Sequence, residues 1–148
     1  MRVDFIRRRE DVEACIDLYM SMTESTFLEI HREYAIKGLD LAARRRQYIR
    51  VLKDGDEIVA FLVAFDLHSL HTKHRILNQS YYGSKLSGVK AFKAVMILHD
   101  DLFEYAVDNK YDLVMAQSSH EDPTFVYSRI LEKLKWERRG HLAIKKTR

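Results

Sequence analysis

A change of hydrophobic period in the second half of the chain constrains the fold more than any other feature. Arg75–Tyr82 has the composition of a strand, and it leads through Gly83 and Gly88 into a long segment with helical spacing that ends at Asn109. Asp112–Gln117 follows as a short apolar segment, which is typical of a strand buried in a parallel pairing. Strand, helix and strand in this order predict a right-handed crossover between parallel strands. The predicted apolar face of the helix consists of Phe92, Val95, Met96, His99, Leu102, Phe103 and Ala106.

The remaining segments predict further helices and an antiparallel meander. Tyr48–Leu52 and Glu57–Leu67 read as strands, and Asp54-Gly55 between them is a hairpin turn. Before the meander we expect a strand at Val3–Ile6 and a helix whose apolar positions are Val12, Cys15, Ile16, Tyr19 and Met20. A break at Thr23–Ser25 separates this helix from a second one, which has helical spacing from Phe27 to Gly38 and continues over Leu39–Gln47. At the end of the chain we expect a last helix that begins at Pro123 and a strand at His141–Lys145. Together they predict an α/β fold with a mixed, mostly antiparallel sheet flanked by helices.

Length and composition restrict the class of protein. The 148 residues suit one domain over residues 1–148, and five glycines with one proline exclude a collagen-like or low-complexity chain. The longest charge-free apolar run, Ile58–Phe65, is far shorter than the roughly 20 residues of a membrane-spanning helix. The charged first residues lack the apolar core of a secretory signal, and Cys15 is the only cysteine. We therefore expect a cytoplasmic protein without a membrane partner, and a net charge of +3 is too small to imply a polyanionic one.

The segment Tyr81–Lys90 is the most informative one for function. It connects a strand end to a helix N-terminus through small residues, a geometry that presents free backbone N–H groups and the positive end of the helix dipole to a phosphate. Its spacing matches neither the P-loop nor the dinucleotide-binding Gly-x-Gly-x-x-Gly motif. The alternative interpretation is a tight turn whose glycines permit positive φ.

The element order and this loop together resemble the GCN5-related N-acetyltransferases, which transfer an acyl group from acyl-coenzyme A to an amine. The family signature is Arg/Gln-x-x-Gly-x-Gly/Ala, and its three specified positions are occupied here by Lys85, Gly88 and Lys90 in that order. The end of the last helix, Leu131–Trp136, is similar to the family's Tyr-Glu-Lys-Leu-Gly-Phe. The resemblance implies acetyl-CoA as co-substrate and a small-molecule or peptide amine as acceptor. It also implies that the coenzyme is bound by Ser80, Tyr81, Tyr82, Lys85, Leu86, Ser87, Gly88, Val89 and Lys90.

Two departures from the family pattern bear on catalysis. Lys90 replaces a residue that is usually small, so that it either contacts a phosphate as a cation or obstructs the cradle. Leu131 stands where many family members have the tyrosine that protonates the departing thiolate, and leucine carries no proton to donate. Tyr127 lies one helical turn earlier and is the candidate general acid, with a core aromatic as the alternative role.

Acyl transfer also requires a group that removes a proton from the attacking ammonium. The candidates at the strand ends are Asn78, Ser80, Ser118, Ser119, His120 and Glu121. His120 has the most suitable chemistry, because an unperturbed imidazole has a pKa near 6.5. Its alternative role is that of a polar loop residue or a helix cap. The predicted catalytic residues are accordingly Tyr127, His120 and Ser118.

Three closely spaced histidines suggest a metal-binding site, but their spacing does not favour it. His68, His71 and His74 lie three residues apart, and imidazoles are good ligands for zinc or copper. Residues three apart in an extended segment point to alternate faces, so that a solvated loop is the better interpretation and no metal is predicted. His31 and His99 fall on predicted apolar helix faces, where core histidines are expected.

The sequence thus supports two functions of different classes. The first is an acyl-CoA-dependent N-acyltransferase that works by direct attack of the amine, with Cys15 in the core rather than acting as a nucleophile. The second is a catalytically decayed binding or accessory module on nucleic acid or a protein assembly, which Lys90 and Leu131 would suit. The basic clusters Arg7–Arg9 and Arg44–Arg46 are expected to be solvated surface, and a homodimer is left open.

Overall fold

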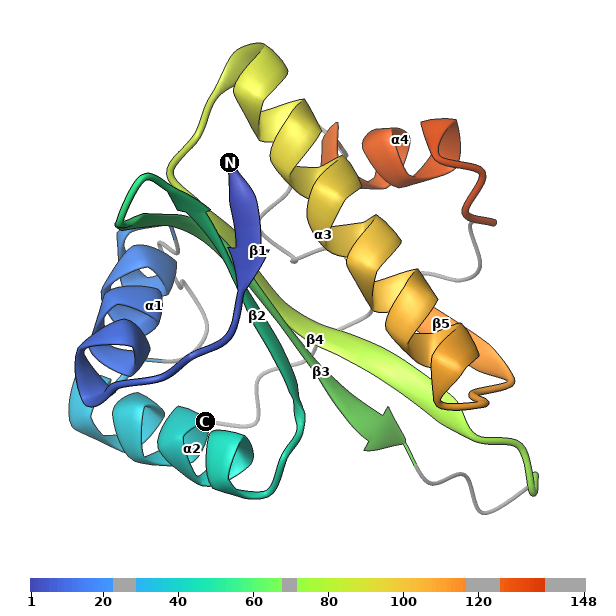
Figure 1. The fold of residues 1–148 in the computed structure, drawn as a ribbon, viewed down its shortest axis with the longest axis horizontal. Coiled ribbons are helices and arrows are strands. Elements are labelled where there is room, and N and C mark those ends of the chain that lie inside the picture. Colours follow the sequence, from blue (N-terminus) through green and yellow to red (C-terminus); the bar gives the residue numbers. More distant parts are fainter. Residues whose placement is uncertain (23–28, 68–71, 117–125, 138–148) are drawn as a thin grey trace.

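The computed structural model describes residues 1–22, 29–67, 72–116 and 126–137, in which helices lie on both faces of a central sheet (Figure 1). Within these ranges the strands form one five-stranded sheet in the order β1-β2-β3-β4-β5. Strands β1 to β4 are antiparallel to their neighbours, whereas β4 and β5 are parallel, which confirms the predicted mixed α/β fold. The elements are β1 (Arg2–Asp4), α1 (Arg9–Met22), α2 (Arg32–Arg44), β2 (Tyr48–Asp54), β3 (Glu57–Leu67), β4 (Ile76–Ser84), α3 (Gly88–Asp108), β5 (Leu113–Ala116) and α4 (Val126–Lys133).

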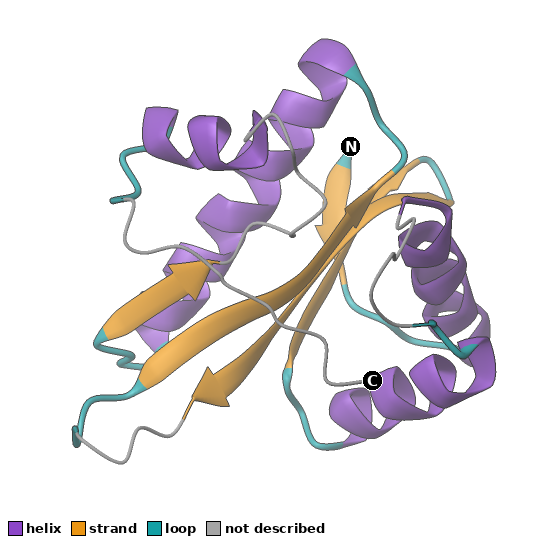
Figure 2. Cartoon of the chain, turned by 180° about the vertical axis from the view of Figure 1, so that it is seen from behind, coloured by secondary structure: helices purple, strands orange, loops and turns teal. Residues whose placement is uncertain are grey.

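The central strand β3 is buried on both faces because helices cover the sheet on each side (Figure 2). Phe61 and Val63 pack into a core formed with α1 and α2. Leu62 and Ala64, which point the other way, pack into a second core formed with α3. Each fully buried apolar side chain of this size contributes roughly 1.5–3 kcal/mol to stability. This double burial explains why the sequence of β3 is almost continuously apolar.

Helix α2 is continuous through Gly38. Gly38 lies inside the helix, which runs to Arg44, so that the helical assignment of the residues after Gly38 is confirmed over most of its length. Leu39 and Ala42 are both buried, and their burial outweighs the roughly 1 kcal/mol that one glycine costs a helix. His31 is exposed at the N-cap position, so its predicted place in the core is wrong.

The buried face of α3 differs from the predicted one in part. Val95, His99, Leu102 and Ala106 are buried as expected, but Phe103 is 57% exposed, and the core takes in Ala94 and Leu98 instead. Periodicity alone does not distinguish adjacent positions at the border of an apolar face, because the face spans more than 100°. The prediction that β5 is a buried strand is also wrong: Leu113 and Met115 are 51% and 36% exposed, and the two other residues of β5 are half-buried.

His99 is a core histidine, as predicted. It is 1% exposed, and its Nδ1 lies 2.8 Å from the carbonyl oxygen of Val95. Burial, opposed in part by this hydrogen bond, lowers the pKa of His99 to about 4. The imidazole is therefore neutral at physiological pH.

The helices α2, α3 and α4 end in the same way. After each one, a residue in the left-handed region follows the C-cap, namely Arg46 (φ 55°), Lys110 (φ 58°) and Lys135 (φ 67°). In α3, the N–H of Lys110 donates to Val107 O at 3.1 Å and that of Tyr111 to Ala106 O at 2.9 Å. These paired bonds are the Schellman motif, in which glycine normally takes the left-handed position. A cation there interacts favourably with the helix dipole but carries the strain of its Cβ.

Several predicted features fall outside the described residues. They are the break at Thr23–Ser25, Phe27, the helix start at Pro123 and the strand at His141–Lys145. Within the part of the chain that the structure describes, no helix is long and apolar enough to span a bilayer.

The left-handed residues give a test of stability. We expect Lys110→Gly to raise the free energy of unfolding by about 0.5–1 kcal/mol, because glycine adopts this conformation without the Cβ penalty. Urea denaturation measures the change. Lys110→Ala is the control, since it removes the charge and keeps the Cβ, and equal stabilisation by both substitutions would contradict the explanation.

Candidate functional site

Strand β4 contains a bulge directly after Gln79, its last pairing residue with the described part of β5. Val63 pairs with Tyr81 and Ala64 with Gln79, which leaves Ser80 as an extra residue on β4. The parallel ladder to β5 ends at the pair Gln79–Ala116. Within the described residues, no strand pairs with the β5 side of the rest of β4. A bulge commonly redirects a strand and ends pairing next to a site of function.

The loop from β4 to α3 ends in a helix N-terminus that no side chain caps. The N–H of Lys85 donates to Val59 O at 3.0 Å, and that of Leu86 donates to Ser84 Oγ at 3.1 Å. Ser87 holds the N-cap position with an extended backbone, but its hydroxyl makes no capping hydrogen bond. The first turn of α3 contains no acidic residue. The first N–H groups of the helix are therefore left for an external acceptor, and the dipole favours an anion there.

The two glycines of this region meet different requirements. Gly88 begins α3 with a φ of +57°, a conformation that favours glycine. The two interpretations of this segment, a tight turn and a binding loop for an anion, are therefore compatible with the same backbone. Gly83 is required for packing, because a Cβ built on it would lie 2.3 Å from Cε1 of Phe61.

The lysines of the loop have different surroundings. Lys85 forms an ion pair with Glu57 at the β2–β3 hairpin, so that its charge is already matched. Lys90 is exposed on the first turn of α3, and no hydrogen bond or ion pair is recorded for it with the described residues. Lys90 thus adds a positive charge to the first turn of the helix.

The other residues predicted to bind coenzyme divide between the two faces of β4. The ring of Tyr82 lies on the α3 side, 5.8 Å from that of His99, and burial raises the pKa of Tyr82 to about 12. Leu86 packs against the same core. Tyr81 lies on the opposite face, where its ring meets that of Tyr19. The structure therefore brings Lys85–Lys90 together as one loop but separates Tyr81 from it.

The end of α4 agrees with the family pattern in its backbone. Lys135 adopts the left-handed conformation at the position of the family's glycine, and Trp136 packs edge-on against His99 at the position of the aromatic residue. Leu131 is 7% exposed and belongs to the buried residues, so that it supplies packing and no proton.

The predicted catalytic residues are only partly covered by the structure. Tyr127 lies in α4, but its side chain is outside what is described, as are Ser118, Ser119, His120 and Glu121. Their roles stay predictions. Of the base candidates on β4, Asn78 donates from Nδ2 to Ser80 Oγ at 3.2 Å, and an amide is not a base at neutral pH.

No metal centre is found among the described residues. His68 and His71 lie outside them, and His74 is an exposed residue whose Nδ1 lies 3.6 Å from Oδ2 of Asp112. Cys15 is fully buried as predicted, and burial raises the pKa of its thiol to about 12, so that it is not a thiolate nucleophile.

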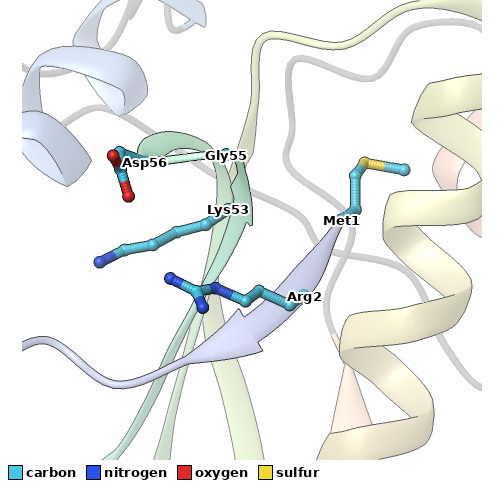
Figure 3. A pocket seen from close by; sticks show the side chains of 5 residues that line it. All are labelled: Met1, Arg2, Lys53, Gly55 and Asp56. Atoms are coloured by element: carbon cyan, nitrogen blue, oxygen red, sulfur yellow. The ribbon is translucent and has the colours of Figure 1, made fainter.

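A surface hollow of about 340 Å³ lies between β1 and the β2–β3 hairpin (Figure 3). It is lined by Met1, Arg2, Lys53, Gly55 and Asp56. The ammonium of Lys53 lies 3.7 Å from Oδ2 of Asp4. The hollow is open to solvent and shares no residue with the cradle, so it carries no function here.

Sequence reasoning missed three structural features of the site. The bulge at Ser80 is invisible locally, since serine is compatible with either face of a strand. The pairing of Glu57 with Lys85 joins residues that are 28 positions apart. The contact of Tyr19 with Tyr81 joins α1 to β4, and only the helical spacing of Tyr19 hinted at its inward direction.

The close approach at Gly83 is testable. We expect Gly83→Ala to lower the free energy of unfolding by about 1–3 kcal/mol, because Phe61 is 2% exposed and has little room to yield. Gly38→Ala is the matched control: a Cβ there meets nothing within 4 Å, and alanine in an exposed helix should add up to ~1 kcal/mol. Urea denaturation of both variants measures the difference, and a Gly83→Ala protein as stable as the wild type would contradict the contact.

Comparison with known proteins gives matches in structure but not in sequence. No protein-family model matches the chain, and no curated protein matches it significantly. A crystal structure described as a probable acetyltransferase matches with a TM-score of 0.74 at 15% identity, covering 99% of each chain. The ribosomal-protein-alanine N-acetyltransferase from Brucella melitensis biovar Abortus 2308 matches with a TM-score of 0.71 at 15% identity, again over 99% of each chain. An aminoglycoside antibiotic 6′-N-acetyltransferase from Acinetobacter haemolyticus matches with a TM-score of 0.73 at 6% identity, covering 100% of this chain and 99% of that one.

TM-scores above 0.7 over nearly the whole chain show a shared fold with these three acetyltransferases, whereas identities of 6–15% show nothing finer. The chain therefore has the fold of the GCN5-related N-acetyltransferases.

Proposed function

We propose that this protein is an acyl-CoA-dependent N-acyltransferase that transfers an acetyl group from acetyl-CoA to an amine by direct attack. The observation that carries the proposal is the uncapped N-terminus of α3, which follows directly on the open part of β4. Free amides, the helix dipole and the exposed ammonium of Lys90 together suit a diphosphate.

The open part of β4 suits the rest of the coenzyme. From Ser80 to Ser84 the strand advances about 13 Å, on the scale of an extended pantetheine arm. Among the described residues, no strand pairs with the β5 side of this stretch, so its backbone groups suit hydrogen bonds to such an arm. The thioester then lies near the bulge at Ser80, where a backbone N–H polarises its carbonyl.

The reaction forms a bond between the amine nitrogen and the acetyl carbon and breaks the bond between that carbon and sulfur. Before attack, the ammonium loses one proton, for which His120 is the proposed base, with Ser118 near it in the chain. The departing thiolate takes up one proton, for which Tyr127 is the proposed donor. Leu131 is buried and carries no exchangeable proton, so a donor is needed elsewhere.

The alternative function is a decayed module that binds nucleic acid or a protein assembly. The observation that favours it is Leu131 in the core at the position of the family's acid. Such a module would bind DNA or RNA with steep salt dependence, and coenzyme A would not change its melting temperature.

Calorimetric titration with coenzyme A tests the cradle. We expect binding by the wild type and at least a roughly tenfold loss of affinity in Lys90→Glu, because a carboxylate at the helix N-terminus repels the diphosphate. Lys37→Glu, an exposed charge reversal on α2, is the matched control and should leave affinity unchanged. No binding at millimolar coenzyme, or equal losses in both variants, would refute the cradle.

Kinetics of a tyrosine variant test the proposed acid. We expect Tyr127→Phe to lower kcat by about 10²-fold or more while the affinity for coenzyme A is unchanged, because the thiolate then departs unprotonated. Tyr34→Phe, at a residue that is 80% exposed on α2, is the control. An unchanged kcat in Tyr127→Phe would assign this residue to packing.

A further inference from the structure

A group of four aromatic residues lies on the face of β4 that is opposite to α3. We call Tyr19, Phe61, Phe65 and Tyr81 the aromatic wall. The ring of Tyr81 stands at 88° to that of Tyr19, with centroids 5.6 Å apart, and at 85° to that of Phe65 at 6.5 Å. Tyr19 also meets Phe61 edge-on at 6.4 Å. Such edge-to-face contacts hold the rings in fixed orientations.

The aromatic wall has a buried back and an exposed front. Phe61 is 2% exposed, whereas Tyr81 is 45% exposed. At its margin, the N–H of Ser84 donates to Sδ of Met22 at 2.8 Å, which ties the end of α1 to β4. An aromatic side chain that is held rigidly by its neighbours and still faces outward is a suitable surface for another flat group.

The wall adjoins the bulge at Ser80 of β4. Tyr81 pairs with Val63 and Asn78 with Phe65, and both partners pack on the α1 side, so Tyr81 and Asn78 share that face. Asn78 also pairs with Met115 of β5, one residue before the parallel ladder ends. The wall is therefore next to the place where an acetyl thioester would present its carbonyl, on the side away from the diphosphate cradle.

Asn78 supplies a polar atom at this place. Its Nδ2 donates to Ser80 Oγ, and its Oδ1 is buried without a hydrogen-bond partner among the described residues. A buried acceptor that is left unpaired is unfavourable, and an incoming N–H donor would satisfy it. The amide orients an amine in this way but does not take its proton.

The charges around the wall distinguish between classes of amine. Asp17 of α1 and Glu33 of α2 both pair with Arg32. The carboxylate of Asp17 accepts two bonds from it, at 2.7 and 3.1 Å. Because Arg32 balances one of the two carboxylates, the three groups keep a net charge of −1, which is small against the several positive charges of a polycation. Aromatic rings instead attract a flat apolar group and the cation that it carries.

We propose that the amine acceptor is a primary amine on an aromatic group, with its ring against Tyr81 and its nitrogen hydrogen-bonded to Oδ1 of Asn78. This inference rests on the proposed acetyl transfer. One N–C bond forms and one C–S bond breaks, the amine proton goes to the base, and the thiolate takes up a proton. Tyr81 determines specificity, and Asn78 is a positioning residue.

The test compares three amines as acceptors with the full chain and acetyl-CoA. We expect kcat/KM for 2-phenylethylamine to exceed that for butylamine and for spermidine by at least about tenfold. Tyr81→Leu should reduce this preference to near unity without changing the affinity for coenzyme A, and Tyr81→Phe should retain it. Phe103→Leu, at an exposed aromatic residue of α3, is the matched control and should leave the preference intact.

The positioning role of Asn78 has a separate signature. Asn78→Ala should raise KM for all three amines while the preference among them is kept, because the lost hydrogen bond is common to them. A preference for spermidine in the wild type, or a preference for 2-phenylethylamine that survives in Tyr81→Leu, would overturn the inference.

Calorimetry on the same preparations separates the two proposals. Binding of coenzyme A without a preference for the aromatic amine overturns the inference and leaves the proposed function standing. Without coenzyme binding the proposed function fails, and saturation-transfer NMR with 2-phenylethylamine then decides the inference directly. A signal in the wild type that Tyr81→Leu loses supports the aromatic wall, and no signal in either protein refutes it.

Discussion

The unequal pairing of β4 is the constraint on which the rest of the structure depends. Among the described residues, this strand pairs with β3 from Ile76 to Ser84 and with β5 as far as Gln79, which lies opposite Ala116, the last described residue of β5. The extra residue Ser80 follows directly after Gln79. One edge of β4 is held in place by the central strand, while its other edge beyond Gln79 has no strand partner among the described residues. A strand that is fixed on one side and open on the other provides a rigid support for an extended substrate.

The two ends of this open stretch offer different chemistry. At one end the chain turns through Gly88 into a helix whose first amides no side chain caps, which suits an anion. At the other end the sheet separates two faces, with His99 and Tyr82 on the α3 side and Tyr19 and Tyr81 on the α1 side. The proposed coenzyme and the proposed amine therefore approach from opposite faces, so that their contacts are made by different residues.

The resemblance seen in the sequence gains support where backbone conformation can be compared. Lys135 has the left-handed conformation that the family's glycine would have, although it is a lysine. Leu131 occupies the position of the family's proton-donating tyrosine and is buried in the folded protein, where it contributes packing only. The Lys85 position is less simple, because its ammonium already has Glu57 as a partner. The proposed cradle therefore relies on backbone amides and Lys90 more than on the residue that aligns with the family's Arg or Gln.

The sequence by itself determined the order and type of the described elements, because apolar periodicity is a local property that burial on one face imposes. It gave the bounds of β3 correctly, and it placed Cys15 and His99 in the core. Only the tertiary structure decided that Phe103 and Leu113 face solvent and that Ser80 forms a bulge. These features depend on contacts between residues far apart in the chain, such as Ala64 with Gln79 and Tyr19 with Tyr81, which no local pattern records.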